Sequence, residues 1–445
     1  MESDDWKVTS KGNEQQSDSE FTLILKSLPK TGTSTDNATG RITQQVVVSR
    51  RIKTVSLKQR NYKAVASLSD ANNAATPLPL ARTPLFEHAV ALKARMTAFS
   101  GWEMPVQYLG IAQEHQAVRQ QAGMFDISHM GKFVLKGQQV IEQLQGLVPS
   151  DLSRLQPGAA QYTVLLTPEA GIVDDLIVYY QGEDGAGQPT VVLIVNAGTT
   201  LKDKTWLTEH LGLNQIDFQD LSTDNALIAV QGPQAIACLQ PLVEADLSAV
   251  KPFGHLMAPV LGQPGFLART GYTGEDGFEV MVDAAAGAEL WRSLLAAGVT
   301  PCGLGCRDTL RLEAAMALYG QDIDETTTPL EAGLGWLVHL DTKGDFIGRS
   351  VLEQQKRAGV ERRLVGLKMA GRNIARHGYP VLHEGQTVGE VTSGSWSPTL
   401  EQAIALAYVP TPLSKVGQQL DIEIRGKLYP GEVVKRPFYR RQTSL

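Results

Sequence analysis

The spacing of hydrophobic residues along the chain changes at about Thr83. Before this point Ser, Thr, Asn and Gln are frequent and apolar clusters are few. After it, apolar residues are dense and interrupted by Gly and Pro, with helix-like spacing over 111–122 and a strand-like run over 162–166. We therefore expect the folded body to begin at Thr83.

Two strands are predicted in the middle of the chain, over 172–180 and 191–195, with a turn-rich segment between them. Both runs are apolar on each face, which is typical of central strands in a sheet. Glycines in the segment 271–277 permit positive φ and favour a hairpin between strands over 265–270 and 277–282.

A helix is predicted over 307–319, where leucines and Met316 supply apolar positions and Gly320 is placed to end it. After about Arg362, short strands alternate with turn signals, and almost nothing fits a helix. We therefore expect an α+β protein with a separate C-terminal β domain.

Size and charge narrow the class of protein. With 445 residues, the chain is too long for one core and suits two or three domains. Hydrophobic residues make up 42% and charged residues 20%, as in soluble globular proteins. A net charge of −6 provides no field to hold a nucleic acid, and no apolar run approaches the roughly 20 residues that cross a bilayer. We expect no nucleic-acid partner and no membrane span.

The cysteines form neither a disulfide framework nor a C-x-x-C pair, since they are only Cys238, Cys302 and Cys306. Three residues separate the last two, and no His is nearby. We expect a reducing compartment and no metal site.

Residues 1–82 differ from the rest in composition. The first 20 residues are acidic and contain no hydrophobic stretch for a secretion signal. All charges over 41–63 are basic, as in an organelle transit peptide, although this segment lies far from the terminus. We predict a disordered extension or a start codon placed too early. The predicted location is the cytoplasm of a bacterium, or the mitochondrial matrix if the extension is a transit segment.

Two adjacent acids, Asp174 and Asp175, interrupt the strand predicted over 172–180. Neighbouring side chains of a strand point to opposite faces, so one of the two must enter a covered layer or a site. Burial of an ionised carboxylate is unfavourable unless it is paired, so that residue is either a satisfied structural acid or a functional one. The periodicity does not choose between the two acids.

Other polar residues are candidates with simpler alternatives. Asn196 ends the second strand, as either a turn-capping amide or a site residue. Glu279 alternates with apolar Phe278 and Val280, which favours a solvent-facing strand acid. Arg307 falls in the first turn of its predicted helix, where the helix dipole disfavours a cation unless an anion is near. Packing alone would explain Met130, Tyr162 and Tyr272.

General catalytic motifs are missing from the sequence. It contains no G-x-S-x-G, no H-E-x-x-H, no G-x-x-x-x-G-K-[ST] and no G-x-G-x-x-G after a strand. Hydrolase, zinc peptidase, P-loop and dinucleotide-binding classes are therefore disfavoured. The residues alone indicate a multidomain protein with a small-molecule site.

Nine stretches between Thr83 and about Arg440 carry a family resemblance. They are TPLF (83–86), GWEMP (101–105), GMFDISHM (123–130), GIVDDL (171–176), RTGYTGEDG (269–277), GLGCRDTLRLE (303–313), LYGQDIDE (318–325), TSG (392–394) and SPTL (397–400). Together they resemble the T-protein, the aminomethyltransferase of the glycine cleavage system. Residues 1–82 lie outside the resemblance.

The resemblance implies a three-domain folate-binding aminomethyltransferase fold around a central hole. Two domains interleaved in sequence would occupy 83–340 and bind folate, 341–361 would connect, and 362–445 would form a C-terminal β-barrel or jelly-roll domain. The implied reaction moves the methylene carbon of an aminomethyl group from the lipoylated H-protein to tetrahydrofolate, the co-substrate. It yields 5,10-methylenetetrahydrofolate, ammonia and dihydrolipoyl H-protein.

The resemblance also implies roles for the candidate residues. Asp175, the second acid of the pair, would be the catalytic acid beside the folate nitrogens. Glu279 would accept hydrogen bonds from the pterin, and Arg307 would bind the anionic glutamate tail at the opposite end of folate. The full set of implied folate contacts is Met130, Tyr162, Asn196, Tyr272, Glu279 and Arg307.

Two related classes compete with this interpretation. A folate-binding relative that assists iron–sulfur assembly carries K-G-C-Y-x-G-Q, whereas residues 317–321 here read ALYGQ. An oxidative demethylase of the sarcosine or dimethylglycine class carries a similar folate domain fused to a flavin-binding domain. The short chain and the missing dinucleotide fingerprint argue against that class.

Overall fold

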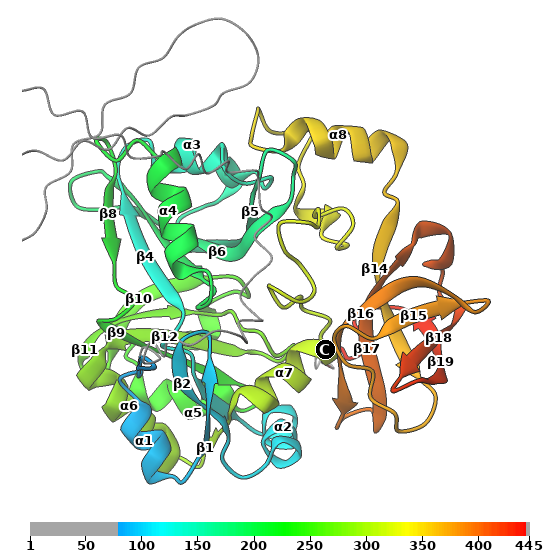
Figure 1. The fold of residues 1–445 in the computed structure, drawn as a ribbon. Coiled ribbons are helices and arrows are strands. Elements are labelled where there is room, and N and C mark those ends of the chain that lie inside the picture. The colour runs from blue at the N-terminus through cyan, green and yellow to red at the C-terminus, as the bar shows by residue number, and fades with distance from the viewer. Residues whose placement is uncertain (1–78, 442–445) are drawn as a thin grey trace, which may run out of the picture. The chain divides into compact units, whose positions relative to one another are not determined.

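The computed structural model describes residues 79–441 (Figure 1). Most of the predicted extension, 1–82, lies outside the described residues. Its last residues do not fit the prediction, because Ala81 forms a parallel bridge with Trp102. The Ala81 N–H donates to the Gly101 carbonyl, and the Ala81 carbonyl accepts from the Glu103 N–H, both at 2.9 Å. The folded body thus begins before Thr83. Within residues 79–441, no helix is both long and apolar enough to cross a membrane.

Two β-sheets are interleaved along the chain. One has five strands in the order β5-β6-β7-β4-β8, and the other has six in the order β10-β11-β12-β9-β3-β13. The chain leaves the six-stranded sheet after β3, builds the five-stranded sheet, and returns at β9. The bounds are β3 (Gly123–Asp126), β4 (Gly131–Lys136), β5 (Ala159–Leu166), β6 (Ile172–Glu183), β7 (Pro189–Val195), β8 (Asp217–Asp220), β9 (Asn225–Gln231), β10 (His255–Val260), β11 (Gln263–Ala268), β12 (Gly277–Asp283) and β13 (Thr300–Pro301).

The two sheets pack face to face, and helices cover their outer faces. The inner layer contains Tyr179 and Val192 of one sheet and Leu227 and Phe266 of the other. Helices α3 (Val140–Gln145) and α4 (Thr200–His210) cover the five-stranded sheet, while α5 (Ala235–Leu239) and α6 (Ala284–Ala296) cover the six-stranded sheet. Both faces of β6 and β7 are therefore buried, which explains their apolar sequences. The predicted central strands are confirmed, since each has a strand on both sides.

The predicted hairpin is confirmed, with β11 and β12 pairing in antiparallel fashion. The helix predicted over 111–122 is α2 (Ile111–Gln120), but the helix predicted over 307–319 is α7 (Leu304–Glu313). Helix α7 ends before the predicted limit because Ala315 adopts a positive φ of 53°. It begins early at the N-cap Gly303, where a Cβ would lie 2.4 Å from the Val106 carbonyl carbon.

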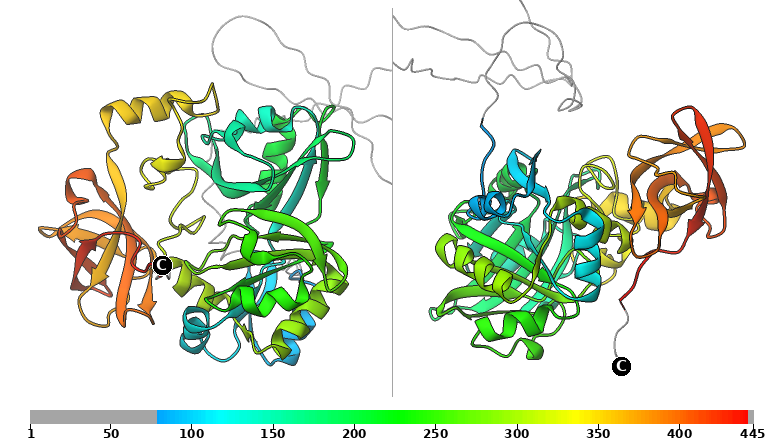
Figure 2. Two further views of the ribbon diagram at one scale, coloured as in Figure 1. Left: turned by 180° about the vertical axis from the view of Figure 1, so that it is seen from behind. Right: turned by 90° about the horizontal axis from the view of Figure 1, so that it is seen from below.

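The C-terminal β domain is a closed barrel in the order β14-β17-β16-β15-β18-β19 (Figure 2). Its small interior residues include Ala403, Ala405 and Ala407. Leu312 of α7 packs against Leu406 of the barrel, outside this interior. The strands are β14 (Arg362–Met369), β15 (Pro380–His383), β16 (Gln386–Ser397), β17 (Gln402–Pro410), β18 (Gln419–Ile424) and β19 (Lys427–Val434). The predicted fold class is confirmed, while the predicted domain limits at residues 340 and 361 stay a prediction.

Shorter elements complete the described chain. The remaining helices and strands are α1 (Phe86–Ala91), β1 (Arg95–Phe99), β2 (Trp102–Gln107), η1 (Leu152–Arg154), η2 (Gln240–Leu242), η3 (Leu247–Ala249), η4 (Gly335–Leu337), α8 (Arg349–Ala358) and η5 (Thr411–Leu413). Strands β1 and β2 form a separate hairpin. Helix α8 lies between the two-sheet region and the barrel in sequence.

Candidate active site

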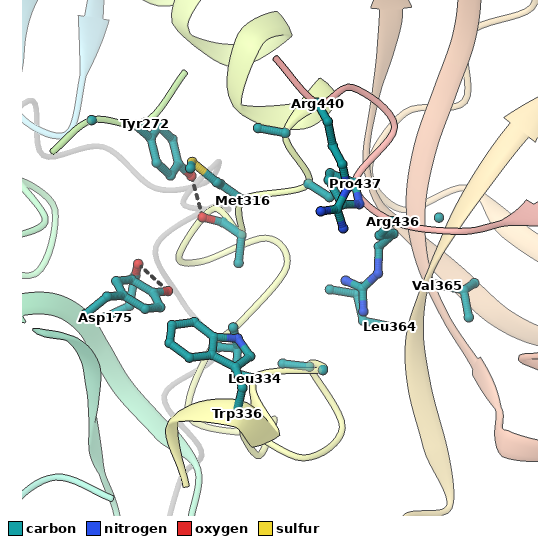
Figure 3. Close-up of a pocket in the computed structure, with 18 of the residues that line it drawn as sticks. Asp175, Tyr272, Met316, Leu334, Trp336, Leu364, Val365, Arg436, Pro437 and Arg440 are labelled. Carbon is teal, nitrogen blue, oxygen red and sulfur yellow. Dashed lines mark hydrogen bonds between the residues drawn. The ribbon is translucent and has the colours of Figure 1, made fainter. Parts of the chain in front are cut away.

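Every site residue named from the sequence lines one cavity of about 770 Å³. Figure 3 shows part of this cavity, including Asp175 and Tyr272. Its walls come from β5, β6, β7, β12, α7, and the barrel strands β14 and β19. The named residues that line it are Met130, Tyr162, Asp175, Asn196, Tyr272, Glu279 and Arg307. The fold thus gathers side chains that are spread over nearly 180 positions of the sequence.

The structure separates the two adjacent acids of β6. Asp175 lines the cavity, whereas Asp174 is fully buried on the other face, towards α4. Asp175 accepts hydrogen bonds from the Tyr162 hydroxyl at 3.0 Å and from Asn196 Nδ2 at 2.8 Å. Asp174 accepts from the Asn196 backbone N–H at 3.1 Å, Asn196 Nδ2 at 3.0 Å and the Thr199 hydroxyl at 2.9 Å. Asn196 therefore ties both acids together.

The surroundings of Asp175 raise the pKa of its carboxyl group to near neutrality. Burial and the charge of Asp174 raise the pKa of Asp175 to about 7, although hydrogen bonds from Tyr162 and Asn196 act in the opposite direction. Burial also raises the pKa of Tyr162 well above its usual value, so Tyr162 remains a hydroxyl donor. Asp175 is thus a carboxyl group that can exchange a proton at physiological pH.

Glu279 does not face solvent as its alternation with apolar residues favoured. It lies on β12 in the layer between the two sheets and is 8% exposed. The Thr270 hydroxyl at 2.6 Å and the Tyr179 hydroxyl at 3.5 Å both donate to its Oε2. Burial raises the pKa of the Glu279 carboxyl. The solvent-facing interpretation is wrong because the five-stranded sheet covers this face.

Arg307 points into the same region as Glu279. Its Nη2 lies 3.9 Å from the Met130 sulfur, and its guanidinium carbon lies 4.6 Å from the centre of the Tyr272 ring. Burial lowers the pKa of Arg307, whereas the nearby Tyr272 and Glu279 raise it. The Arg307 charge in turn lowers the pKa of Glu279. Glu279 and Arg307 are therefore near enough for their charges to interact, and their assignment to opposite ends of folate stays a prediction.

The cavity lining also includes residues that were not named from the sequence, among them Trp336, Arg436 and Arg440. Trp336 is 60% exposed and stacks on Tyr162, with ring centroids 6.0 Å apart and an interplanar angle of 21°. Arg436 and Arg440 lie across the cavity from Asp175 (Figure 3). The available signals were a tryptophan that follows Gly333 and Gly335, and four basic residues within 435–441.

A possible metal-ligand group lies elsewhere. Glu114, Cys302 and Cys306 have ligand atoms within 4.8 Å of one another. Both Glu114 oxygens already accept backbone N–H groups, from Tyr108 at 2.6 Å on one side and Gly303 at 2.9 Å on the other. The carboxylate thus has a structural role that anchors the start of α7, and the cavity does not include this group.

Comparisons with known proteins define the class. Residues 85–342 match the GCVT N-terminal domain, and residues 362–440 match the glycine cleavage T-protein C-terminal barrel domain. The chain therefore belongs to the glycine cleavage T-protein family of aminomethyltransferases.

Individual relatives agree with this assignment. An aminomethyltransferase of Nostoc sp. (strain PCC 7120) is 70% identical over 370 residues, which cover 83% of this chain and 98% of the relative. An aminomethyltransferase of Synechocystis sp. is 63% identical over 364 residues, covering 82% and 98%. The crystal structure of aminomethyltransferase T from Bartonella henselae is 34% identical with a TM-score of 0.75, and covers 81% of this chain and 98% of that one. The predicted family and aminomethyltransferase activity in glycine cleavage are confirmed.

Proposed function

We propose that the cavity binds tetrahydrofolate and that Asp175 promotes transfer of a methylene carbon to it from the aminomethyl group on a lipoylated H-protein. The observation that carries the proposal is the position of Asp175. This carboxyl group has a pKa of about 7 and faces a cavity lined by hydrogen-bonding, aromatic and cationic side chains. Family membership supports the aminomethyl donor, and the donor and acceptor chemistry of the cavity supports folate.

The inner end of the cavity suits the pterin. Glu279 Oε2 is held by Thr270 and Tyr179, while no described residue donates to Oε1. A pterin edge presents a ring N–H beside an exocyclic amine, which are the donors that a carboxylate accepts. Met130, Tyr272 and Arg307 supply polarisable and flat surfaces beside it. We assign Asn196 and Tyr162 to orientation of Asp175, and Trp336 to stacking on the ligand.

The barrel end of the cavity suits the anionic glutamate tail. Arg363, Lys435, Arg436 and Arg440 line this end. Within the described chain, no ion pair joins Arg436 to an acid, and burial lowers the pKa of its guanidinium. Carboxylates of a folate tail would pair with these cations. We therefore propose that the tail lies at the barrel rather than at Arg307.

Asp175 then acts on the folate nitrogens that form the new bonds. Two C–N bonds form to the methylene carbon, and its bonds to the amine nitrogen and the lipoyl sulfur break. The two protons lost from the folate nitrogens leave on ammonia and on the thiol. Ionised Asp175 accepts a hydrogen bond from a reacting nitrogen and stabilises positive charge that develops on the methylene group.

A transfer assay with loaded, lipoylated H-protein tests the proposal. The expected result is one 5,10-methylenetetrahydrofolate and one ammonia for each aminomethyl group, with turnover that depends on tetrahydrofolate. Ammonia release at the same rate with and without tetrahydrofolate would contradict it.

We also propose a cytoplasmic location, supported by the cyanobacterial source of the relatives. The mitochondrial alternative depends on residues that lie almost entirely outside the described chain.

A further inference from the structure

A third carboxyl group, Asp203 of α4, extends the acid pair of β6 away from the cavity. Asp203 is fully buried, and neither of its oxygens accepts a hydrogen bond from an N–H or O–H group of the described residues. It contacts the Asp174 carboxyl directly. Two ionised carboxylates do not remain in such contact without a cation between them, so one of the two carries a proton.

The hydrogen-bond donors identify which acid carries this proton. Asp174 accepts three hydrogen bonds, two from Asn196 and one from the Thr199 hydroxyl. The Thr199 hydroxyl also lies near Asp203, but its hydrogen-bond acceptors are Asp174 at 2.9 Å and the Asn196 carbonyl at 3.1 Å. Donors stabilise the ionised form of an acid, and Asp203 has none. The proton therefore belongs on Asp203.

Within residues 79–441, no ion pair joins Asp203 to a cation. The charge of Lys202 lowers the pKa of Asp203, but this side chain donates to the Tyr319 hydroxyl at 2.6 Å and to Glu325 at 2.8 Å. Tyr319 in turn donates to the Ile172 carbonyl at 3.2 Å. Two further acids, Asp175 on the cavity side and Asp324 near Tyr319, would add repulsion. Burial and the charge of Asp174 accordingly raise the pKa of Asp203 to about 10.

We propose that Asp203 is a positioning residue, a neutral acid at physiological pH whose proton is hydrogen-bonded to Asp174 and keeps Asp174 ionised. Ionised Asp174 fixes the Asn196 amide, which donates to Asp175 at 2.8 Å. The charge of Asp174 also helps to raise the pKa of Asp175. This inference rests on the proposed role of Asp175 only for its effect on catalysis, since the proton on Asp203 can be observed separately.

Infrared difference spectroscopy tests the proton directly. The spectrum of the full chain minus that of Asp203→Asn at pH 7 should contain the C=O stretch of a protonated carboxylic acid. That band should disappear from the parent protein as pH rises through about 10. A difference spectrum with only carboxylate bands would overturn the proposal, whatever the activity of either protein.

Kinetics distinguish positioning from packing. Asp203→Asn retains a neutral donor to Asp174, so it should keep most of the turnover and leave the pH–rate profile within a few tenths of a unit. Asp203→Leu fills similar space without a donor, so Asp174 takes up a proton more easily and no longer raises the pKa of Asp175. Its profile should move to lower pH by about one unit.

Equal shifts of the pH–rate profile in both variants would overturn the positioning role. If Asp203→Leu does not fold, the infrared result and the Asp203→Asn profile still decide. The parent protein could show the infrared band while its pH–rate profile lacks the rising limb that Asp175 should produce near pH 7. That result would contradict the proposed function but not the proton on Asp203.

Discussion

The Tyr162 hydroxyl donates a hydrogen bond of 3.0 Å to Oδ2 of Asp175, from β5 to the adjacent strand β6. The donor stabilises the ionised carboxylate and so opposes the burial that raises the pKa of Asp175 to about 7. Because burial and the Asp174 charge remain when the donor is removed, this bond helps to set how much ionised carboxylate exists at neutral pH.

Tyr162→Phe should move the pH dependence of turnover without abolishing it. Loss of the donor raises the pKa of Asp175 above 7, so the rising limb of kcat should shift to higher pH by about one unit. Turnover should fall at pH 7 and recover at pH 9, since the Phe ring still stacks on Trp336. The measurement is kcat against pH, with Tyr180→Phe of β6 as the matched control. An equal loss at every pH would contradict this account.

Asp175→Asn and Asp174→Asn should fail in different ways. The first should cut turnover roughly 100-fold or more with little change in thermal stability, because it removes a positioned ionisable group. The second should lower the free energy of unfolding by about 1–3 kcal/mol, because an amide donor would face Asn196 in a buried site. Steady-state kinetics and thermal unfolding of both variants provide the check. Normal turnover in the Asp175 variant with loss in the Asp174 variant would shift the assignment by one residue.

Local periodicity could locate β6 and β7 but could not choose between the two acids. Both faces of β6 are covered, one by α3 and α4 and the other by the six-stranded sheet. Alternation in a sequence separates buried from exposed faces, and here neither face is exposed. Glu279 lies on β12 of the six-stranded sheet and is buried because the five-stranded sheet covers its face. Which layer covers a strand is tertiary information, and in this chain it came from family resemblance rather than from the pattern.

The missed residues depend on contacts between distant segments. Asp203 looks like an ordinary acid in the first turn of α4, and only its contact with Asp174 makes it unusual. Arg436 reaches the cavity because β19 closes the barrel beside it. The end of α7 was misplaced because the residues after Glu313 favour a helix locally, whereas Ala315 adopts a positive φ that ends the helix.

Asp203→Asn should also change how stability depends on pH. The pKa of Asp203 is about 10 in the folded protein and near its ordinary value of 3.8 when unfolded, so folding takes up a proton between these values. The contribution of Asp203 to stability therefore falls as pH rises through this window. Asn does not titrate, so the stability of the variant relative to the parent should grow by about 1.4 kcal/mol per pH unit between roughly pH 5 and 9.

Denaturant unfolding of both proteins across this range measures the effect. Asp220→Asn is the matched control, because hydrogen bonds from Ser222 and Lys204 lower the pKa of Asp220 despite partial burial. Its stabilising contribution is complete above its ordinary pKa, so the difference from the parent should stay constant between pH 5 and 9. A constant difference for Asp203→Asn as well would show that Asp203 is ionised in the folded protein.

The two ends of the cavity should respond differently to substitution. Glu279→Gln places an amide at Oε1 or Oε2, so one acceptor for the pterin or for Thr270 becomes a donor. Affinity should fall by about 1–3 kcal/mol, and equally for a tail-less pterin, tetrahydrofolate and its polyglutamate.

Arg436→Met removes a cation at the barrel end and keeps part of the apolar stem. It should spare the tail-less pterin and weaken the polyglutamate most, with a loss that shrinks as salt rises, because salt already screens that attraction in the parent protein. Calorimetric titration of the three ligands at two salt concentrations gives the comparison, with Arg307→Met as the matched loss of a cation beside Glu279. Arg307→Met should weaken the binding of all three ligands. Folate would bind in the opposite orientation if Arg307→Met left the affinity for the tail-less pterin unchanged, or if Arg436→Met lowered it.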